Sequence, residues 1–281
     1  MINKKYLKNL RCKEINNKNN FFFDLYNERI IDSLDIITLD FKNILILGDQ
    51  GAKIYKYIQK RFKDSLISIC DFKNGNSNNF NSKNVKKIST DVDLWIKESI
   101  KYDLILSNFF LNISENLEKV LKTILTSLVP NGFFLATLPD PKNFYLLKSA
   151  MIETDVQLYG GAYNRFNRTT NLQKIIEILK ENNFKIPLVN SEIIKLEYKK
   201  FNKLLLDVRS MNLSYYYKDK KKSFEKKIYF KKLEQNYKKN ANQTFELTSN
   251  FYTISGWKEH SSQQKPMKPG EAKNQLKDLL G

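Results

Sequence analysis

Two glycines and an aspartate near the first apolar segment could hold a nucleotide cofactor. Gly48 and Gly51 lie in ILILGDQGAKI, and Asp71 ends a second apolar segment, SLISICD. Glycines at such a turn let backbone N–H groups approach the ligand, and an acidic residue about 20 residues further on accepts hydrogen bonds from the ribose hydroxyls. A turn glycine and a strand-end aspartate explain the same residues without a ligand, so the motif alone leaves both interpretations open.

Other polar residues follow the next apolar segments. Asp91 comes after the third predicted strand and could accept a hydrogen bond from an adenine amino group, while Ser107 and Asn108 end the fourth. Each is a common loop residue, but successive strand ends of one sheet can line a single pocket. The predicted cofactor-binding residues are Gly48, Asp49, Gly51, Asp71, Asp91, Ser107 and Asn108.

The C-terminal part holds the only histidine, in FYTISGWKEHSSQQKPMKPGEA. A lone histidine is usually structural or solvated, but beside Trp257 we interpret His260 as a candidate contact to a substrate. One histidine excludes a His dyad. The two cysteines, Cys12 and Cys70, lie in no CxxC or Cys/His cluster, so we predict no disulfide framework and no metal site.

Alternating strands and helices predict the fold. Apolar segments at 43–47, 65–70, 85–89, 102–108 and 132–138 predict strands separated by helices, and 185–198 and 245–258 predict two more. A helix is expected over 21–39. Buried strands that alternate with helices indicate an α/β fold with a doubly wound, mostly parallel, seven-stranded Rossmann-like sheet. A helical insertion precedes the last strand, and ligands are expected beyond the carboxyl ends of the strands.

These elements suggest five parts. We predict an N-terminal helical segment at 1–40, an α/β core at 41–197 and a basic helical insertion at 198–241. Residues 242–265 complete the core with the last strand, and 266–281 form a C-terminal tail.

Several segments resemble one family. The pattern G-W-K-x-H-x-S-Q-x-x-P, from Gly256 to Pro266, is similar to the C-terminal signature of the S-adenosylmethionine (SAM) methyltransferase-fold arginine hydroxylases that assist assembly of respiratory complex I. DVRSMNLS resembles the family's D-L-R-x-M-G segment, YGGAYNRF its G-G-x-x-x-R-F block, and FFFDLYNERIIDSL its N-terminal helix. The resemblance covers nearly the whole chain and is weakest at 50–100 and 215–240.

The resemblance implies a protein that binds SAM and modifies an arginine of a protein substrate, a complex I subunit. Asp207 and His260 would then orient the acceptor, and Trp257 would stack on a guanidinium, which gives the predicted catalytic residues. The chain departs from the family's L-D-L-G-C-G-x-G motif, since it has Ile46 at the acidic position and Gln50 and Ala52 at two glycine positions.

Those departures favour an alternative, a non-catalytic assembly factor that has lost SAM binding. A weaker alternative is a small-molecule or carrier-protein O-methyltransferase. A further alternative, a nucleic-acid methyltransferase, is suggested only by the net charge of +18. We interpret the basic segment 215–240 as solvated helix faces and expect no stable complex with nucleic acid.

Location is predicted from hydropathy and from the first residues. No apolar segment approaches the roughly 20 residues that span a bilayer, so any membrane association is peripheral, through a membrane complex. The basic start slightly resembles an organelle presequence but lacks its Ser and Arg richness. We expect a bacterial cytoplasmic protein, with peripheral contact to the inner membrane.

Overall fold

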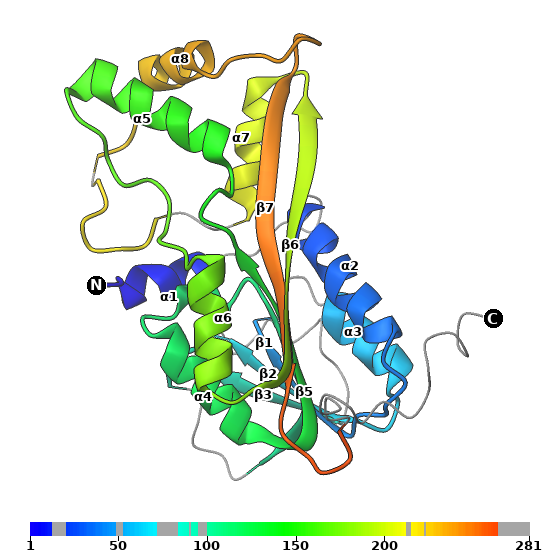
Figure 1. Ribbon diagram of the computed structural model, residues 1–281. Coiled ribbons are helices and arrows are strands. Elements are labelled where there is room, and N and C mark those ends of the chain that lie inside the picture. Colours follow the sequence, from blue (N-terminus) through cyan, green and yellow to red (C-terminus); the bar gives the residue numbers. More distant parts are fainter. Residues whose placement is uncertain are drawn as a thin grey trace, which may run out of the picture.

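A seven-stranded sheet forms the centre of the molecule, in the order β3-β2-β1-β4-β5-β7-β6 (Figure 1). The computed structural model describes residues 1–12, 21–48, 53–71, 84–89, 91–94, 100–211, 215–221 and 223–263, with the side chains of 10–12 excepted. The strands are β1 (Asn43–Leu47), β2 (Leu66–Asp71), β3 (Val85–Ser89), β4 (Tyr102–Asn108), β5 (Leu128–Pro139), β6 (Lys185–Tyr198) and β7 (Phe245–Trp257). Strands β1 to β5 are parallel, and β7 is antiparallel to both β5 and β6. The predicted fold class is confirmed.

Helices cover both faces of this sheet (Figure 1). On one face, α2 (Phe21–Asp35) and α3 (Lys53–Arg61) pack against Ile44 and Ile46 of β1. On the other, α4 (Leu117–Ser127) and α6 (Leu172–Glu181) pack in one cluster with Leu45 and Leu47. Because successive strand residues point to opposite faces, a strand covered on both sides must be apolar throughout, which explains the sequence ILIL.

Helix α1 (Lys4–Cys12) lies in the predicted N-terminal helical segment, whereas α5 (Tyr145–Tyr159) is not anticipated by the sequence pattern. Helix α5 exposes Tyr145, Ile152 and Val156 as well as burying apolar residues, so it lacks the single apolar stripe that marks a surface helix. Helix α4 ends at Ser127, because β5 begins at Leu128 and Pro130 cannot continue a helix.

The β6–β7 pair extends beyond the rest of the sheet (Figure 1). Strand β7 pairs with β5 only between Phe251 and Trp257, whereas its pairing with β6 continues to Phe245. Helix α7 (Phe201–Ser210) follows β6, and α8 (Lys227–Asn236) precedes β7, so both belong to the predicted insertion. Helix α5, which lies outside the predicted insertion, packs against α8. The insertion therefore draws on two separate parts of the chain and is held above the carboxyl ends of the parallel strands.

Tyr26 connects α2 to the end of β4 and to β7. Its ring stacks on Phe109 at 4.2 Å between centroids and meets Phe251 edge-on at 4.8 Å. Its hydroxyl lies 2.5 Å from the Ser249 hydroxyl, and complete burial raises the pKa of Tyr26. One side chain thus links α2, the end of β4 and the β6–β7 pair.

Among the helices of the described ranges, none combines the length and the apolar character needed to cross a membrane.

Phe251→Ala should destabilise the protein strongly. Phe251 is fully buried where β7 leaves β5, and removing such a ring costs about 3–5 kcal/mol of unfolding free energy. Ile193→Ala on the neighbouring strand is the control, since Ile193 is 61% exposed, and a loss below about 1 kcal/mol is expected. Urea unfolding of both variants measures the difference. Equal losses would show that the β6–β7 extension does not depend on this core.

Candidate functional site

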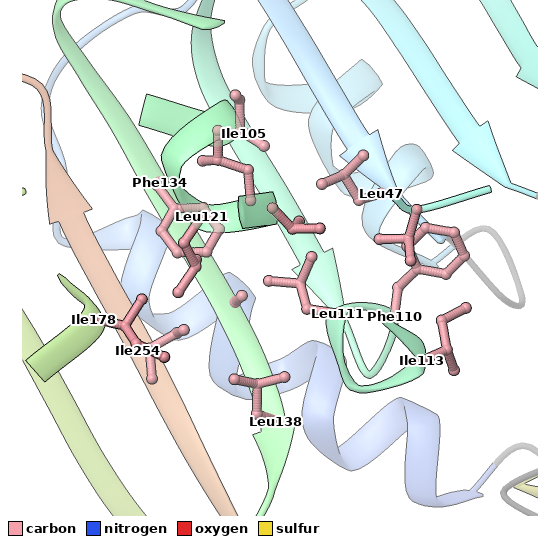
Figure 2. Close-up of a cluster of buried hydrophobic side chains, with 14 of the residues drawn as sticks. Leu47, Ile105, Phe110, Leu111, Ile113, Leu121, Phe134, Leu138, Ile178 and Ile254 are labelled. Carbon is pink, nitrogen blue, oxygen red and sulfur yellow. The ribbon is translucent and has the colours of Figure 1, made fainter. Parts of the chain in front are cut away.

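Gly48 follows β1 and adopts a left-handed backbone, with φ +72°. A Cβ at this position would lie 2.5 Å from ring atoms of Phe110 (Figure 2 shows Phe110 beside Leu47). Both the dihedral angle and this close packing require glycine, so Gly48 has a structural explanation that does not depend on a cofactor. Asp49 and Gly51, the neighbouring predicted contacts, lie outside the described residues.

Asp71 and Ser107 lie at the carboxyl ends of strands on either side of β1. Asp71 is half-buried at the end of β2, opposite Ser89 of β3. Ser107 is fully buried beside Leu47 in β4, and its hydroxyl has no hydrogen-bond partner among the described residues. A buried hydroxyl without a partner is costly unless a ligand supplies one. Asp71, Gly48 and Ser107 therefore fit the ribose side of a nucleotide site.

Asn108 joins elements of the scaffold. Its amide nitrogen donates to Asn27 of α2, and its amide oxygen accepts from Thr137 of β5 at 2.7 Å. With both ends of the side chain bonded inside the protein, Asn108 positions the end of β4 between α2 and β5.

Asp91 is held by the N-terminal helix. Lys4 of α1 contacts both Asp91, at 2.8 Å, and Asp93, at 2.7 Å. Partial burial opposes the charge on Lys4, but its hydrogen bonds to the two carboxylates outweigh that effect and raise its pKa. Asp91 could therefore accept a hydrogen bond from an adenine amino group only while it is also bonded to Lys4. The structure brings Lys4 into the site, where no sequence motif had indicated it.

Two adjoining cavities lie between the strand ends and the insertion. The larger, of about 870 Å³, is bounded by α5, α7 and the segments around Arg165 and Lys221. The smaller, of about 430 Å³, is bounded by Ile2, Arg168 and Tyr217 among others. Both are lined by Asn112, whose amide oxygen is buried and has no hydrogen-bond partner in the part of the chain that the structure describes. Asn112 is thus a polar acceptor between the two cavities.

Arg165 of the YGGAYNRF segment is fixed in an ionic network at the larger cavity. It bonds Asp155 through two nitrogens and Glu225 at 2.8 Å, and its guanidinium lies 4.4 Å from the centre of the Tyr229 ring. Burial opposes its charge, but these hydrogen bonds outweigh the effect and raise the pKa of Arg165. Asp155 is fully buried. The network ties α5 to the segment before α8, so Arg165 builds the wall of the cavity.

Asp207 lies on the other face of α7. The α7 side chains that line the larger cavity are Asn202, Leu205, Leu206, Val208 and Arg209. Asp207 is buried, and Lys203 donates to it at 2.8 Å. Burial and then the charge of Asp207 raise the pKa of Tyr198. The structure therefore buries Asp207 against Lys203 and Tyr198, away from the cavity.

Trp257 and His260 lie at the opposite end of the sheet from these cavities. Trp257 pairs with Phe133, which lies level with the start of β4, whereas the carboxyl end of β5, Pro139, pairs with Phe251. Six residue steps of strand separate the two ends, about 20 Å. The structure does not bring Asp207, Trp257 and His260 together, which corrects the expectation that they act on one acceptor. The physical reason is that β7 runs antiparallel, so its last residues reach the amino-terminal edge of the sheet.

The C-terminal signature closes a turn instead. Lys258 donates to the Leu128 carbonyl at 2.6 Å, and its backbone N–H bonds Gly132. The Gln263 amide bonds Asn131 and the Lys258 carbonyl, while the exposed His260 ring bonds Ser262 at 2.7 Å. These contacts account for the polar density of GWKEHSSQ without substrate chemistry.

Three curated relatives are arginine hydroxylases. The chain is 28% identical over 188 residues to the mitochondrial arginine-hydroxylase NDUFAF5 of Dictyostelium discoideum, a match that covers 66% of this chain and 43% of that protein. The proteins of the same name from Danio rerio and Homo sapiens are 21% and 23% identical, over 89% and 87% of this chain and 79% and 72% of their own lengths. The chain thus spans less than half of the Dictyostelium protein. The resemblance to arginine hydroxylases is confirmed, although no family model matches the chain.

Solved structures agree on the fold. A protein from Bacillus halodurans described as a methyltransferase superposes with a TM-score of 0.54 at 10% identity, over 83% of this chain and 98% of that one. The YcgJ protein of Bacillus subtilis superposes with a TM-score of 0.55 at 10% identity, over 84% and 99%. At this identity the likeness establishes a Rossmann-like methyltransferase fold and nothing about the ligand.

Acid should loosen α1 from the site. Partial burial opposes the charge of Asp93, but hydrogen bonds from Lys4, Ser114 and the Glu115 amide outweigh it and hold its pKa below the usual value. The ion pair with Lys4 therefore stabilises the folded state at neutral pH, and this contribution is lost as the pH falls below about 4. Amide hydrogen exchange, corrected for its intrinsic pH dependence, should show faster opening of α1 at low pH.

Helix α6 provides the internal comparison, because its N-cap, Asn171, is uncharged. Asp93→Asn should reproduce the opening of α1 at neutral pH. If α1 and α6 lose protection in parallel, the Lys4 ion pairs do not hold α1 in place.

Proposed function

We propose that this chain is a SAM-binding protein of methyltransferase fold that modifies an arginine of a protein substrate during assembly of respiratory complex I. The observation that carries the proposal is the match to arginine hydroxylases along 87–89% of the chain, together with a cavity of about 870 Å³ at the strand ends. A cavity bounded by a large insertion suits an acceptor that is itself part of a polypeptide.

The cofactor would be held at the end of β1. Asp71 would accept hydrogen bonds from ribose hydroxyls, the Gly48 turn would admit the ligand close to the backbone, and Ser107 would supply a hydroxyl. Asp91, Asp49 and Gly51 remain predicted contacts, and Asp91 would contribute while still paired with Lys4. When bound, SAM supplies an activated methyl carbon.

The acceptor would enter from the larger cavity. Asn112 lines both cavities, and its amide oxygen, which has no partner within the described ranges, could accept a hydrogen bond from a guanidinium N–H. The packed walls, with Phe144 and Leu147 on one side and Leu205 on the other, would exclude water and limit the orientations of the acceptor. The contribution of these residues is therefore positioning.

A second candidate function is a non-catalytic assembly factor. It is favoured by the ring of Phe110 against Gly48 and by the engagement of Asp91 with Lys4, both of which occupy surfaces that a cofactor would use. The larger residues Gln50 and Ala52 at the family's glycine positions point the same way. Such a protein would keep the insertion and its cavity as a binding surface.

The proposed partner is a complex I subunit. The names of the relatives place those proteins in mitochondria, and a bacterial cytoplasmic location, with peripheral contact to a membrane complex, stays our prediction for this chain.

Arginine modification should be visible by mass spectrometry. Complex I would be isolated from cells that carry the chain and from cells that lack it, and its peptides compared by tandem mass spectrometry. We expect one arginine site that gains an oxygen atom, or a methyl group, only when the chain is present. Reintroduced Asp71→Asn should reduce the modified fraction, whereas Lys195→Gln, on the exposed edge of β6, should not.

Complex I that assembles only with the chain but carries no modified arginine would favour the non-catalytic function. Unchanged complex I without the chain would contradict both.

A further inference from the structure

The larger cavity carries an excess of positive charge. Its lining includes five basic side chains and a single acidic one, Glu225; the basic residues are Lys148, Arg165, Arg209, Lys220 and Lys221. A cavity that received only a guanidinium would be expected to present the opposite sign. The positive charge therefore favours an occupant that carries negative charge.

Glu225 is already neutralised by the chain itself. It accepts from Arg165 at 2.8 Å, from Lys221 at 2.9 Å and from the Tyr159 hydroxyl at 2.5 Å. Burial opposes the charge of Glu225, but these hydrogen bonds outweigh it and lower its pKa. Its negative charge is consequently neutralised by Arg165 and Lys221 and does not offset the remaining cations.

Three cations keep their charge available to the cavity. Arg209, in the last turn of α7, is exposed, and its guanidinium forms no hydrogen bond or ion pair with any residue of the described ranges. Lys220 donates to the uncharged Tyr6 hydroxyl at 2.5 Å and lies 4.2 Å from the centre of that ring. Lys148 donates to the Pro141 carbonyl at 2.9 Å. Neither lysine forms an ion pair within the described ranges; burial lowers the pKa of Lys148, and the nearby charge of Asp140 partly offsets that effect.

Apolar side chains form the floor between these cations. Leu147 and Met151 of α5 face Leu205 and Leu206 of α7, and Phe230 of α8 adds a ring at the edge. Phe224, also in the lining, is 99% exposed. An occupant that satisfies both features carries carboxylates on an apolar frame.

We propose that this cavity binds an acidic peptide segment whose carboxylates pair with Arg209, Lys220 and Lys148 while its apolar side chains cover the floor. Arg209 can hold a carboxylate through two parallel hydrogen bonds, which makes it the principal contact. Identifying this segment with the region around the modified arginine rests on the proposed function; the binding itself does not. An anionic lipid surface would use the same charge, but a recessed cavity suits a chain of alternating side chains better than a flat surface.

Fluorescence anisotropy with defined peptides tests this binding in the full-length protein without SAM. The probes are a short labelled peptide in which glutamate alternates with leucine, its glutamine analogue and its lysine analogue. We expect the glutamate peptide to bind, the glutamine analogue to bind at least tenfold more weakly, and the affinity to fall with added salt. Arg209→Gln should weaken the glutamate peptide about tenfold.

Lys195→Gln is the matched control, because it removes one exposed positive charge from β6, away from the cavity, and should leave the affinity unchanged. Equal binding of the glutamate and glutamine peptides, or an unchanged affinity in Arg209→Gln, would overturn the proposal. If the protein binds phosphatidylglycerol vesicles in an Arg209-dependent manner but binds no peptide, the proposal is overturned in favour of a lipid surface. If the unmodified protein binds the glutamate peptide but does not bind SAM, only the proposed enzyme is contradicted.

Discussion

The pairing of β6 with β7 beyond the edge of β5 supports the upper half of the molecule (Figure 1). A two-stranded ribbon alone is marginally stable in water, so this extension depends on the core that covers it. That core joins Phe201 of α7, Phe144 before α5 and Tyr26 of α2 around Phe251. The same contacts that stabilise the ribbon thereby fix α5, α7 and α8 above the carboxyl ends of the parallel strands.

This arrangement separates two tasks along one axis. The ends of β1, β2 and β4 hold Gly48, Asp71 and Ser107, the proposed cofactor contacts, and the insertion borders the basic, apolar-floored cavity that we propose for a polypeptide. Asn112 lies where the two cavities meet. Helix α1 contributes to the lower level through Lys4, so the N-terminal residues take part in the site as well as in the fold.

The sequence predicts the sheet well, because the central residues of strands such as NILIL and YDLILSN are buried on both faces and are therefore apolar. It predicts the site less well. Trp257 and His260 were placed with Asp207 because a short motif does not reveal at which end of an antiparallel strand it will lie. Lys4 and Phe110 were missed because their contacts, to Asp91 and to Gly48, join residues far apart in the chain.

Whether the strand ends still bind a cofactor is the central question, and a calorimetric titration with SAM answers it most directly. The account predicts saturable binding that S-adenosylhomocysteine displaces and that Asp71→Asn weakens at least tenfold, since a charge-assisted hydrogen bond to the ribose is lost. His260→Ala, at the opposite end of the sheet, should bind as the unmodified protein does. Absence of heat at about millimolar ligand, or equal loss of binding in His260→Ala, would contradict it.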